Sequence, residues 1–366
     1  MLCLPLCLKI TIIYTIIIGL KINSLNSKIN INIMTTTRER LRWIDVCRSI
    51  FMLMILWFHT EIYYFGDLVL PYSMYVENAL AGFFFISGYL FIPKIYSKSN
   101  KIIIYNIFRK LIIPYIVFSL FLGITKVLFR GESIDFILII KNILTGNASW
   151  FISALIMCQL FLVIIRYICN NRILLLFACT IPFLYISFTK NYSNYSIIDG
   201  TSISILFMYF GYLYRKTEKL LDSINNIYYI FLALILIFLK ITVFIYNLDM
   251  TFYYISIDNY LIFLLDTLLW CIIIVKIVKQ IHIENIYISY MEWIGKHTLV
   301  FYFLSGGVPL VITTFMHKLF SIHSNYSILL IVFLLVLITT TIISYLLFNI
   351  KFFRNKILYV DIEIIN

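Results

Sequence analysis

Charged side chains are scarce in this sequence. They account for 13% of the 366 residues, whereas 62% of the residues are apolar and the mean hydropathy is +0.98. Apolar stretches of about 20 residues, enough for a helix to cross about 30 Å of hydrocarbon, recur along the whole length. No stretch remains for a soluble domain of useful size. The composition therefore predicts an all-α, polytopic membrane protein.

Cysteine motifs are missing as well. None of the seven cysteines belongs to a CxxC motif or to a spacing typical of metal sites, and five of them fall within or at the ends of apolar stretches. We interpret these five as packing residues and expect neither a disulfide framework nor a metal site. No internal repeat is visible.

The apolar stretches predict a bundle of about ten transmembrane helices. We place them near residues 44–64, 76–92, 108–129, 149–168, 172–189, 197–214, 227–246, 255–275, 293–314 and 327–350. The third and fourth helices are then joined by an outer loop over residues 130–148.

A net charge of +12 could indicate a nucleic-acid partner, but the basic residues sit in short clusters between the apolar stretches. Nineteen of them lie on one side of the predicted bundle, and the other side has only Arg130, Lys141, Lys190 and Lys318. The positive-inside bias places both ends of the bundle in the cytoplasm. We therefore expect no nucleic acid, membrane lipids as the surroundings, and a multi-pass protein of a bacterial inner membrane.

The first 33 residues do not fit this scheme. They begin with an apolar run that Lys9 interrupts, and a tract rich in Ser and Asn follows. A signal sequence, an additional span and an extension upstream of a true start at Met34 all explain this pattern, and we favour the extension. The predicted organisation is an N-terminal extension over 1–33, a transmembrane domain over 34–356 and a cytoplasmic tail over 357–366.

The first span, RLRWIDVCRSIFMLMILWFHTE, contains polar residues that are costly in a membrane. Arg48 and His59 are eleven residues apart, which places them within about 20° on one helix face and about 16 Å apart along the axis. Asp45 is about 60° from Arg48. An interfacial histidine, and an arginine that snorkels or pairs with Asp45, remain structural alternatives. The shared face favours a polar cavity in which imidazole exchanges protons and guanidinium binds phosphate.

This span resembles that of a known family. The segments WIDVCR at 43–48, with a His eleven residues after its Arg, and GFFFISGYLF at 82–91 are similar to the membrane-bound acyltransferase family 3. FRKLIIPYIVFS at 108–119, SWFISALIMCQL at 149–160 and WIGKHTLVFYFLSG at 293–306 resemble its later segments, in family order. Members O-acylate surface polysaccharides and other exported glycans, and the short subgroup includes fucose 4-O-acetylase-like proteins.

The resemblance implies that acetyl-CoA or a related acyl-CoA is the donor, used from the cytoplasmic side, and that His59 is the catalytic residue. Neutral imidazole is a suitable base for a sugar hydroxyl that attacks a thioester. The phosphates of CoA require a basic site, for which Arg48, with Asp45 beside it, Arg109 and Lys110 are the candidates. Positive-inside anchoring also explains Arg109 and Lys110.

Further residues are weaker candidates. Glu61 either orients the His59 imidazole or is an ordinary carboxylate of the outer side. Ser87 and Gly88 either border the substrate cavity or serve close helix packing. Trp150 is either an interfacial anchor or an acceptor contact.

Three other positions, Ser305, Lys240 and Asp266, are also informative. Many relatives carry His where this chain has Ser305, so a second essential imidazole is not expected there. Lys240 and Asp266, counted as the other charges inside the membrane, are predicted to form a structural ion pair.

The predicted function is an integral-membrane O-acyltransferase, most simply an O-acetyltransferase, that acts on a cell-surface polysaccharide or a lipid-linked glycan. A transporter or flippase for lipid-linked sugars is the alternative, although internal symmetry and broken helices, which are common in transporters, are not visible in the sequence. An unrelated lipid-modifying acyltransferase would need a His deep in a late span, and none is evident. The sequence gives no oligomeric state.

Overall fold

The computed structural model describes residues 41–131, 133–168, 171–189, 196–251, 255–281, 285–319 and 326–358. The predicted N-terminal extension (1–33), the candidate start at Met34 and residues 359–366 of the predicted tail lie outside this range. Residues from Arg42 onward form one compact unit.

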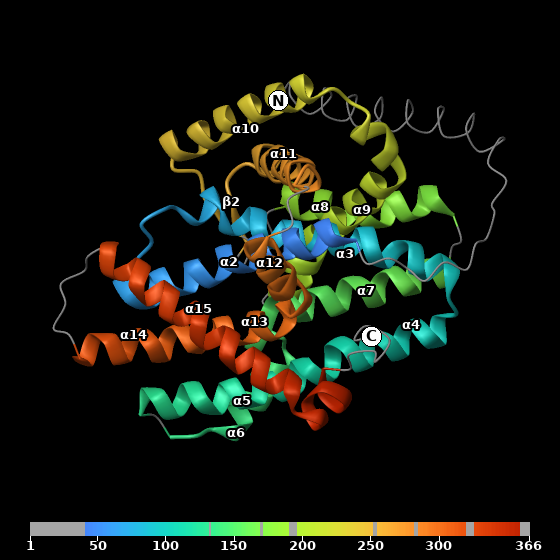
Figure 1. Cartoon of the computed structure of the whole chain (residues 1–366). Coiled ribbons are helices and arrows are strands. Elements are labelled where there is room, and N and C mark those ends of the chain that lie inside the picture. Colours follow the sequence, from blue (N-terminus) through green and yellow to red (C-terminus); the bar gives the residue numbers. More distant parts are fainter. Residues whose placement is uncertain are drawn as a thin grey trace. The chain divides into compact units, whose positions relative to one another are not determined.

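Helices make up almost all of the described chain, in agreement with the predicted all-α class (Figure 1). The elements are α2 (Arg42–Phe65), the 3₁₀ turn η1 (Tyr72–Met74), α3 (Val76–Ser97), α4 (Asn100–Ile107), the π-helix η2 (Phe108–Ile112), α5 (Ile113–Arg130), α6 (Phe136–Leu144), the 3₁₀ turn η3 (Asn147–Ser149), α7 (Trp150–Ile168), α8 (Arg172–Thr189), α9 (Ser196–Asp222), α10 (Asn226–Ile245), β1 (Met250–Thr251), β2 (Ser256–Ile257), α11 (Tyr260–Lys279), α12 (Ile286–Lys296), α13 (Thr298–Ser305), α14 (Val308–Leu319), α15 (Tyr326–Asn349) and the π-helix η4 (Phe353–Ile357).

Within the described residues, nine helical stretches are long and apolar enough to cross a membrane. A bent pair of helices, Thr298–Ser305 with Val308–Lys318, brings the number to ten if it forms one span. The protein is therefore a polytopic membrane protein, as its composition predicts.

Helix α2 lies inside the bundle rather than at its edge, because it contacts α3, α11, α12, α13, α14 and α15. Its closest neighbour at the start is α12, where a side chain at Gly295 would collide with the carbonyl oxygen of Asp45 at 1.9 Å. Arg42 also forms an ion pair with Glu292 of α12. The first span is thus enclosed by other helices, so its polar face does not meet lipid.

Helices α3 and α9 approach each other at backbone distance. A Cβ atom at Gly88 would lie 1.8 Å from the carbonyl oxygen of Met208, and one at Gly211 would lie 1.8 Å from that of Phe85. Each glycine therefore accommodates the backbone of the opposite helix, which is the use of small residues common in membrane bundles.

The connection between the third and fourth spans is not the loop that the sequence predicts. Helix α6 packs along α5, and Tyr115 of α5 donates a hydrogen bond to the carbonyl oxygen of Ile143 near the end of α6, at 2.7 Å. Figure 1 shows α6 returning beside α5 before α7 begins. The apolar sequence of α6 explains the difference, because a helix of apolar residues packs against the neighbouring span α5 instead of remaining in water.

The ninth predicted span, 293–314, is also not continuous. The chain forms α12, α13 and α14 in succession, and the axes of α13 and α14 differ by 44°. The break falls at Gly306 and Gly307, where the absence of side chains permits a bend. The sequence shows no sign of this break, which becomes visible only in the structure.

Candidate active site

In the structure, Arg48 and His59 lie on one face of α2, as the sequence predicts. Because α2 is one continuous helix of 24 residues, Arg48 and His59 project from the same side of it, with Met52 and Ile55 between them. Met52 and Ile55 are 0% and 2% exposed, whereas Arg48 and His59 are half-buried. The face is therefore turned toward protein, and two apolar side chains fill the stretch that separates the cation from the imidazole.

The imidazole of His59 has aromatic neighbours. Its ring centroid lies 5.1 Å from that of Phe58 and 6.2 Å from that of Tyr63, with which it is nearly parallel. Among the residues that the structure describes, none forms a hydrogen bond with the imidazole. Both ring nitrogens can therefore serve a substrate, which is the condition for general-base catalysis.

A cation from another span lies beside His59. Lys126 of α5 is close enough for its positive charge to act on the imidazole, and its Nζ lies 3.3 Å from the position that a Cβ atom at Gly306 would take. We did not single out Lys126 from the sequence, although it is a charge within the predicted span 108–129. Its presence at that place in an apolar run is the signal that could have identified it.

The break between α13 and α14 meets α2 and α5 at this point. The hydroxyl group of Tyr63 donates a hydrogen bond to the carbonyl oxygen of Gly306, at 3.4 Å. A Cβ atom at Gly307 would lie 3.0 Å from Leu122 of α5. Elements that are distant in the sequence thus meet near His59, where Tyr63 of the same helix and Lys126 of α5 both lie close to Gly306.

Ser305 precedes this break and is buried. Its hydroxyl group donates to the carbonyl oxygen of Tyr302 in the same helix, at 2.7 Å. Ser305 thus bonds the backbone of its own helix.

Glu61 contacts the outer connection between α2 and α3 instead of His59. Its carboxylate accepts hydrogen bonds from the backbone N–H of Val69, at 2.8 Å, and from the hydroxyl group of Tyr75, at 2.9 Å. Burial and the bond to Glu61 raise the pKa of Tyr75, so this hydroxyl group stays a donor. Two residues correspond to about 200° of rotation along a helix, which explains why Glu61 and His59 point in different directions.

The predicted donor-site residues come from two spans. Arg48 lies on α2, near the buried Asp45, whereas Arg109 and Lys110 lie on the π-helix η2 that leads into α5. The guanidinium carbon of Arg109 is 6.0 Å from the ring centroid of Tyr105. All three basic side chains are half-buried.

The predicted substrate residues lie in the packed part of the bundle. Gly88 faces the backbone of α9, as described above, and Ser87 beside it is half-buried. Trp150 begins α7 and packs against Gly200 of α9, with ring carbons 3.7 Å from where a Cβ atom would be. The next residue, Phe151, reaches α13, because its ring centroid lies 5.1 Å from that of Tyr302.

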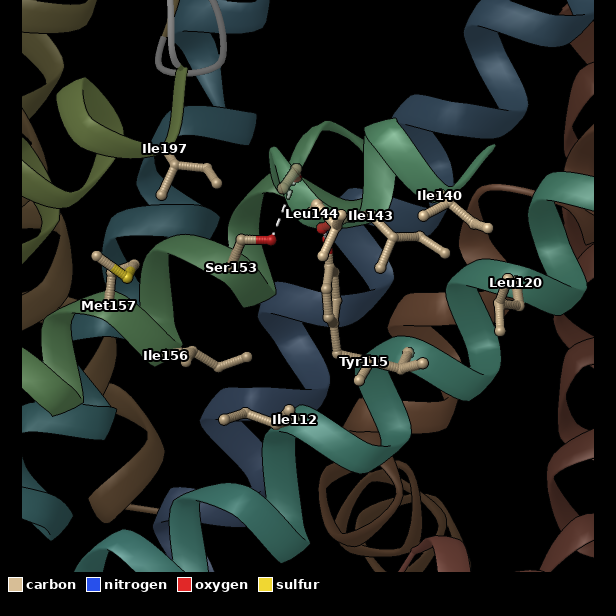
Figure 2. Close-up of a pocket in the computed structure, with 12 residues that line it drawn as sticks. Ile112, Tyr115, Leu120, Ile140, Ile143, Leu144, Ser153, Ile156, Met157 and Ile197 are labelled. Atoms are coloured by element: carbon tan, nitrogen blue, oxygen red, sulfur yellow. Dashed lines mark hydrogen bonds between the residues drawn. The ribbon is translucent and has the colours of Figure 1, made fainter. Parts of the chain in front are cut away.

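An apolar groove lies next to the start of α7, between α5, α6 and α7 (Figure 2). Its volume is about 400 Å³, and its walls are chiefly Ile, Leu and Met side chains. The hydroxyl groups of Tyr115 and Ser153, which also line it, donate to backbone carbonyl oxygens of the neighbouring connection. The groove therefore suits a hydrocarbon chain better than a sugar.

The sequence matches one known protein family over most of its length. Residues 41–349 match the acyltransferase domain of family 3. The chain belongs to acyltransferase family 3. No curated protein and no solved structure matches it.

Membership of this family shows that the protein is a membrane acyltransferase. The matched residues of this family 3 protein include both ends of the polar face of α2, Lys126 and the break after α13. No group of three or more His, Cys, Asp or Glu residues that could hold a metal ion occurs within the described part of the chain.

Proposed function

We propose that this family 3 protein is an O-acyltransferase that transfers an acyl group, most simply acetyl, from acyl-CoA to a hydroxyl group of a cell-surface polysaccharide or lipid-linked glycan. The observation that carries the proposal is the half-buried imidazole of His59, which no described residue hydrogen-bonds and which lies on the same helix face as Arg48. A base and a phosphate-binding cation thus lie about 16 Å apart along one helix.

In the proposed reaction, the imidazole of His59 takes the proton of the acceptor hydroxyl group while the oxygen attacks the thioester carbon. The new C–O bond forms and the C–S bond breaks. The imidazole then passes the proton to the departing thiolate, so CoA leaves as the thiol and the histidine regains its neutral form.

Arg48, Arg109 and Lys110 are proposed to bind the phosphate groups of CoA near the cytoplasmic surface. The pantetheine arm would then extend along the polar face of α2 toward His59. Because Met52 and Ile55 fill this face, they have to move aside when the donor binds. Trp150 is proposed as a contact of the acceptor sugar, whereas Glu61 supports the connection above His59.

The test is transfer of isotopically labelled acetyl groups from acetyl-CoA to glycan by membranes that contain the wild type or His59→Ala. We expect the variant to accumulate normally, because His59 forms no hydrogen bond with the described protein, and to lose a factor of about 10² to 10⁴ in rate. His317→Ala is the matched control, since His317 binds the backbone of Tyr64 instead and should retain transfer. Normal transfer by His59→Ala would refute the assignment.

The broken span favours one alternative, a transporter or flippase for lipid-linked sugars, because transporters commonly contain such helices near the middle of the membrane. Purified protein with acetyl-CoA separates the two functions. Transfer or hydrolysis of the thioester supports the enzyme, whereas movement of a lipid-linked sugar across vesicles without consumption of acetyl-CoA supports the transporter.

A further inference from the structure

A second polar cluster lies within the bundle, and neither the family nor the proposed reaction accounts for it. Its centre is the ammonium group of Lys240 on α10, which lies 2.7 Å from a carboxylate oxygen of Asp266 on α11. This contact confirms the predicted ion pair. Lys240 also donates to the carbonyl oxygen of Ser73 at 2.6 Å and to the side-chain oxygen of Asn78 at 2.7 Å.

The cluster contains a third charged group that we did not single out from the sequence. Glu77, in the first turn of α3, has a carboxyl oxygen 3.6 Å from the ammonium group of Lys240. Glu77 and Asp266 are both 0% exposed. Two buried carboxyl groups therefore share one lysine, whose own side chain is 14% exposed.

The hydrogen bonds of the cluster do not satisfy these carboxyl groups. The side-chain amide of Asn78 donates to Oδ2 of Asp266 at 3.0 Å. Oδ1 of Asp266 and both oxygens of Glu77 are buried without a hydrogen-bond partner. Ionised carboxylates only accept hydrogen bonds, so no arrangement of two carboxylates supplies the missing donor. Buried polar groups without partners are costly.

A single proton would supply the missing hydrogen-bond donor and would remove the repulsion between two buried carboxylates. Both carboxyl groups lie close to the same ammonium group, at 3.6 Å for Glu77 and 2.7 Å for Asp266, and Lys240 and Asp266 are the charged groups that act on Glu77 from the packed helices. A protonated Glu77 could donate to Oδ1 of Asp266. One ammonium group would then face one carboxylate, and the cluster would carry no net charge, whereas two ionised carboxyl groups at this distance repel each other.

We propose that Glu77 and Asp266 form a proton-binding site in the membrane and hold one exchangeable proton between them. The proton belongs to the pair, as expected for two strongly interacting carboxyl groups. With the proton in place, Lys240 is free of a second carboxylate and keeps its bond to the carbonyl oxygen of Ser73.

The position of the site connects it with His59. Ser73 belongs to η1 in the connection between α2 and α3, and the ring centroid of Tyr72 in the same turn lies 5.4 Å from that of Phe58. Phe58 in turn contacts the His59 ring. The proton therefore stabilises the segment that packs beside the candidate base, and it does so whether or not the proposed glycan acceptor is correct.

Infrared difference spectroscopy of the purified full-length protein in H₂O and D₂O tests the proposal. We expect the wild type to show the C=O band of a protonated carboxylic acid with a shift in D₂O. Glu77→Gln should lose this band. Asp266→Asn should lose it as well, because Glu77 is then the sole carboxylate that faces Lys240 and ionises. Glu218→Gln is the matched control and should retain the band, since Glu218 is bonded to Lys279 and Tyr89 elsewhere.

Thermal unfolding provides a second measurement. The folded protein holds a proton that the unfolded chain releases at neutral pH, so the wild type should lose stability as the pH rises. Glu77→Gln should unfold near the wild-type temperature at neutral pH, because its amide donates to Asp266 as the acid does, and should show a smaller alkaline loss. The absence of the band from the wild type, its survival in both variants, or equal alkaline loss in wild type and Glu77→Gln would each overturn the proposal.

Discussion

The hydroxyl group of Tyr63 donates a hydrogen bond to the carbonyl oxygen of Gly306, 3.4 Å away, and so connects the polar face of α2 to the break between α13 and α14. A carbonyl group at the end of a helix lacks the donor that the next turn would supply. Tyr63 supplies it, and Lys126 lies beside the same glycine. The bend is thus bonded to α2 one turn after His59.

Tyr63→Phe should weaken this contact without removing the ring that stacks on His59. We expect a loss of about 1 kcal/mol in the free energy of unfolding and a lower rate of transfer, because the bend is less well fixed. Tyr64→Phe is the matched control, since the Tyr64 hydroxyl group is buried without a hydrogen-bond partner and its removal should be nearly neutral. Thermal unfolding and transfer rates in detergent measure both. Equal effects of the two substitutions would contradict a special role for Tyr63.

Arg48→Met should raise the KM for acetyl-CoA by about tenfold or more with little change in kcat, because a charge-assisted hydrogen bond to phosphate contributes about 1.5 to 3 kcal/mol. Arg166→Met is the control. It removes a cation of α7 whose guanidinium carbon lies 4.9 Å from the ring centroid of Tyr96, and it should leave the KM unchanged. An unchanged KM in Arg48→Met would leave Arg48 with the structural role of an anchor.

Glu61→Ala should destabilise the protein by about 1 kcal/mol, because it removes the acceptor of two partly buried hydrogen bonds, from Val69 and from Tyr75. Glu61→Gln keeps one acceptor oxygen and should have a smaller effect. At a temperature at which all forms are folded, both variants should transfer acyl groups at rates near that of the wild type. A large loss of kcat in folded Glu61→Gln would restore the predicted catalytic role.

Gly88→Ala should destabilise the bundle by about 1 to 3 kcal/mol or more, because its methyl group collides with the backbone of α9. The matched control is Gly200→Ala on α9, where the nearest atoms lie at ordinary contact distances of 3.7 Å or more. The amounts of folded protein after detergent extraction compare the two. If Gly88→Ala accumulates normally and raises the KM for the acceptor, the substrate role of Gly88 is supported instead.

The span pattern could be predicted from the sequence because long apolar runs have few alternatives in a bilayer. The face shared by Arg48 and His59 followed from helical geometry, and so did the pairing of Lys240 with Asp266 across two neighbouring spans. These predictions need only the helical period and the position of a residue along its span, and both can be read from a sequence.

The contacts that depend on packing between distant helices could not be predicted. Lys126 approaches Gly306 because α5 packs beside the break after Ser305. The oxygens of Glu77 that lack hydrogen-bond partners are visible only once α10 and α11 are in place. Glu61 is two residues after His59, so the helical period predicts that its side chain points away from His59. Its partners could not be predicted, because they lie in a connection without periodicity.

The lysine on α10 also has a consequence for biosynthesis. Most of α10 is exposed on the outside of the bundle, and Lys240 anchors it to α3 and α11. Glu77 and Asn78 precede α10 in the chain, so their side chains are synthesised before Lys240. The ammonium group therefore has acceptors available when α10 enters the membrane, and the order of synthesis limits how long an unshielded charge resides in lipid.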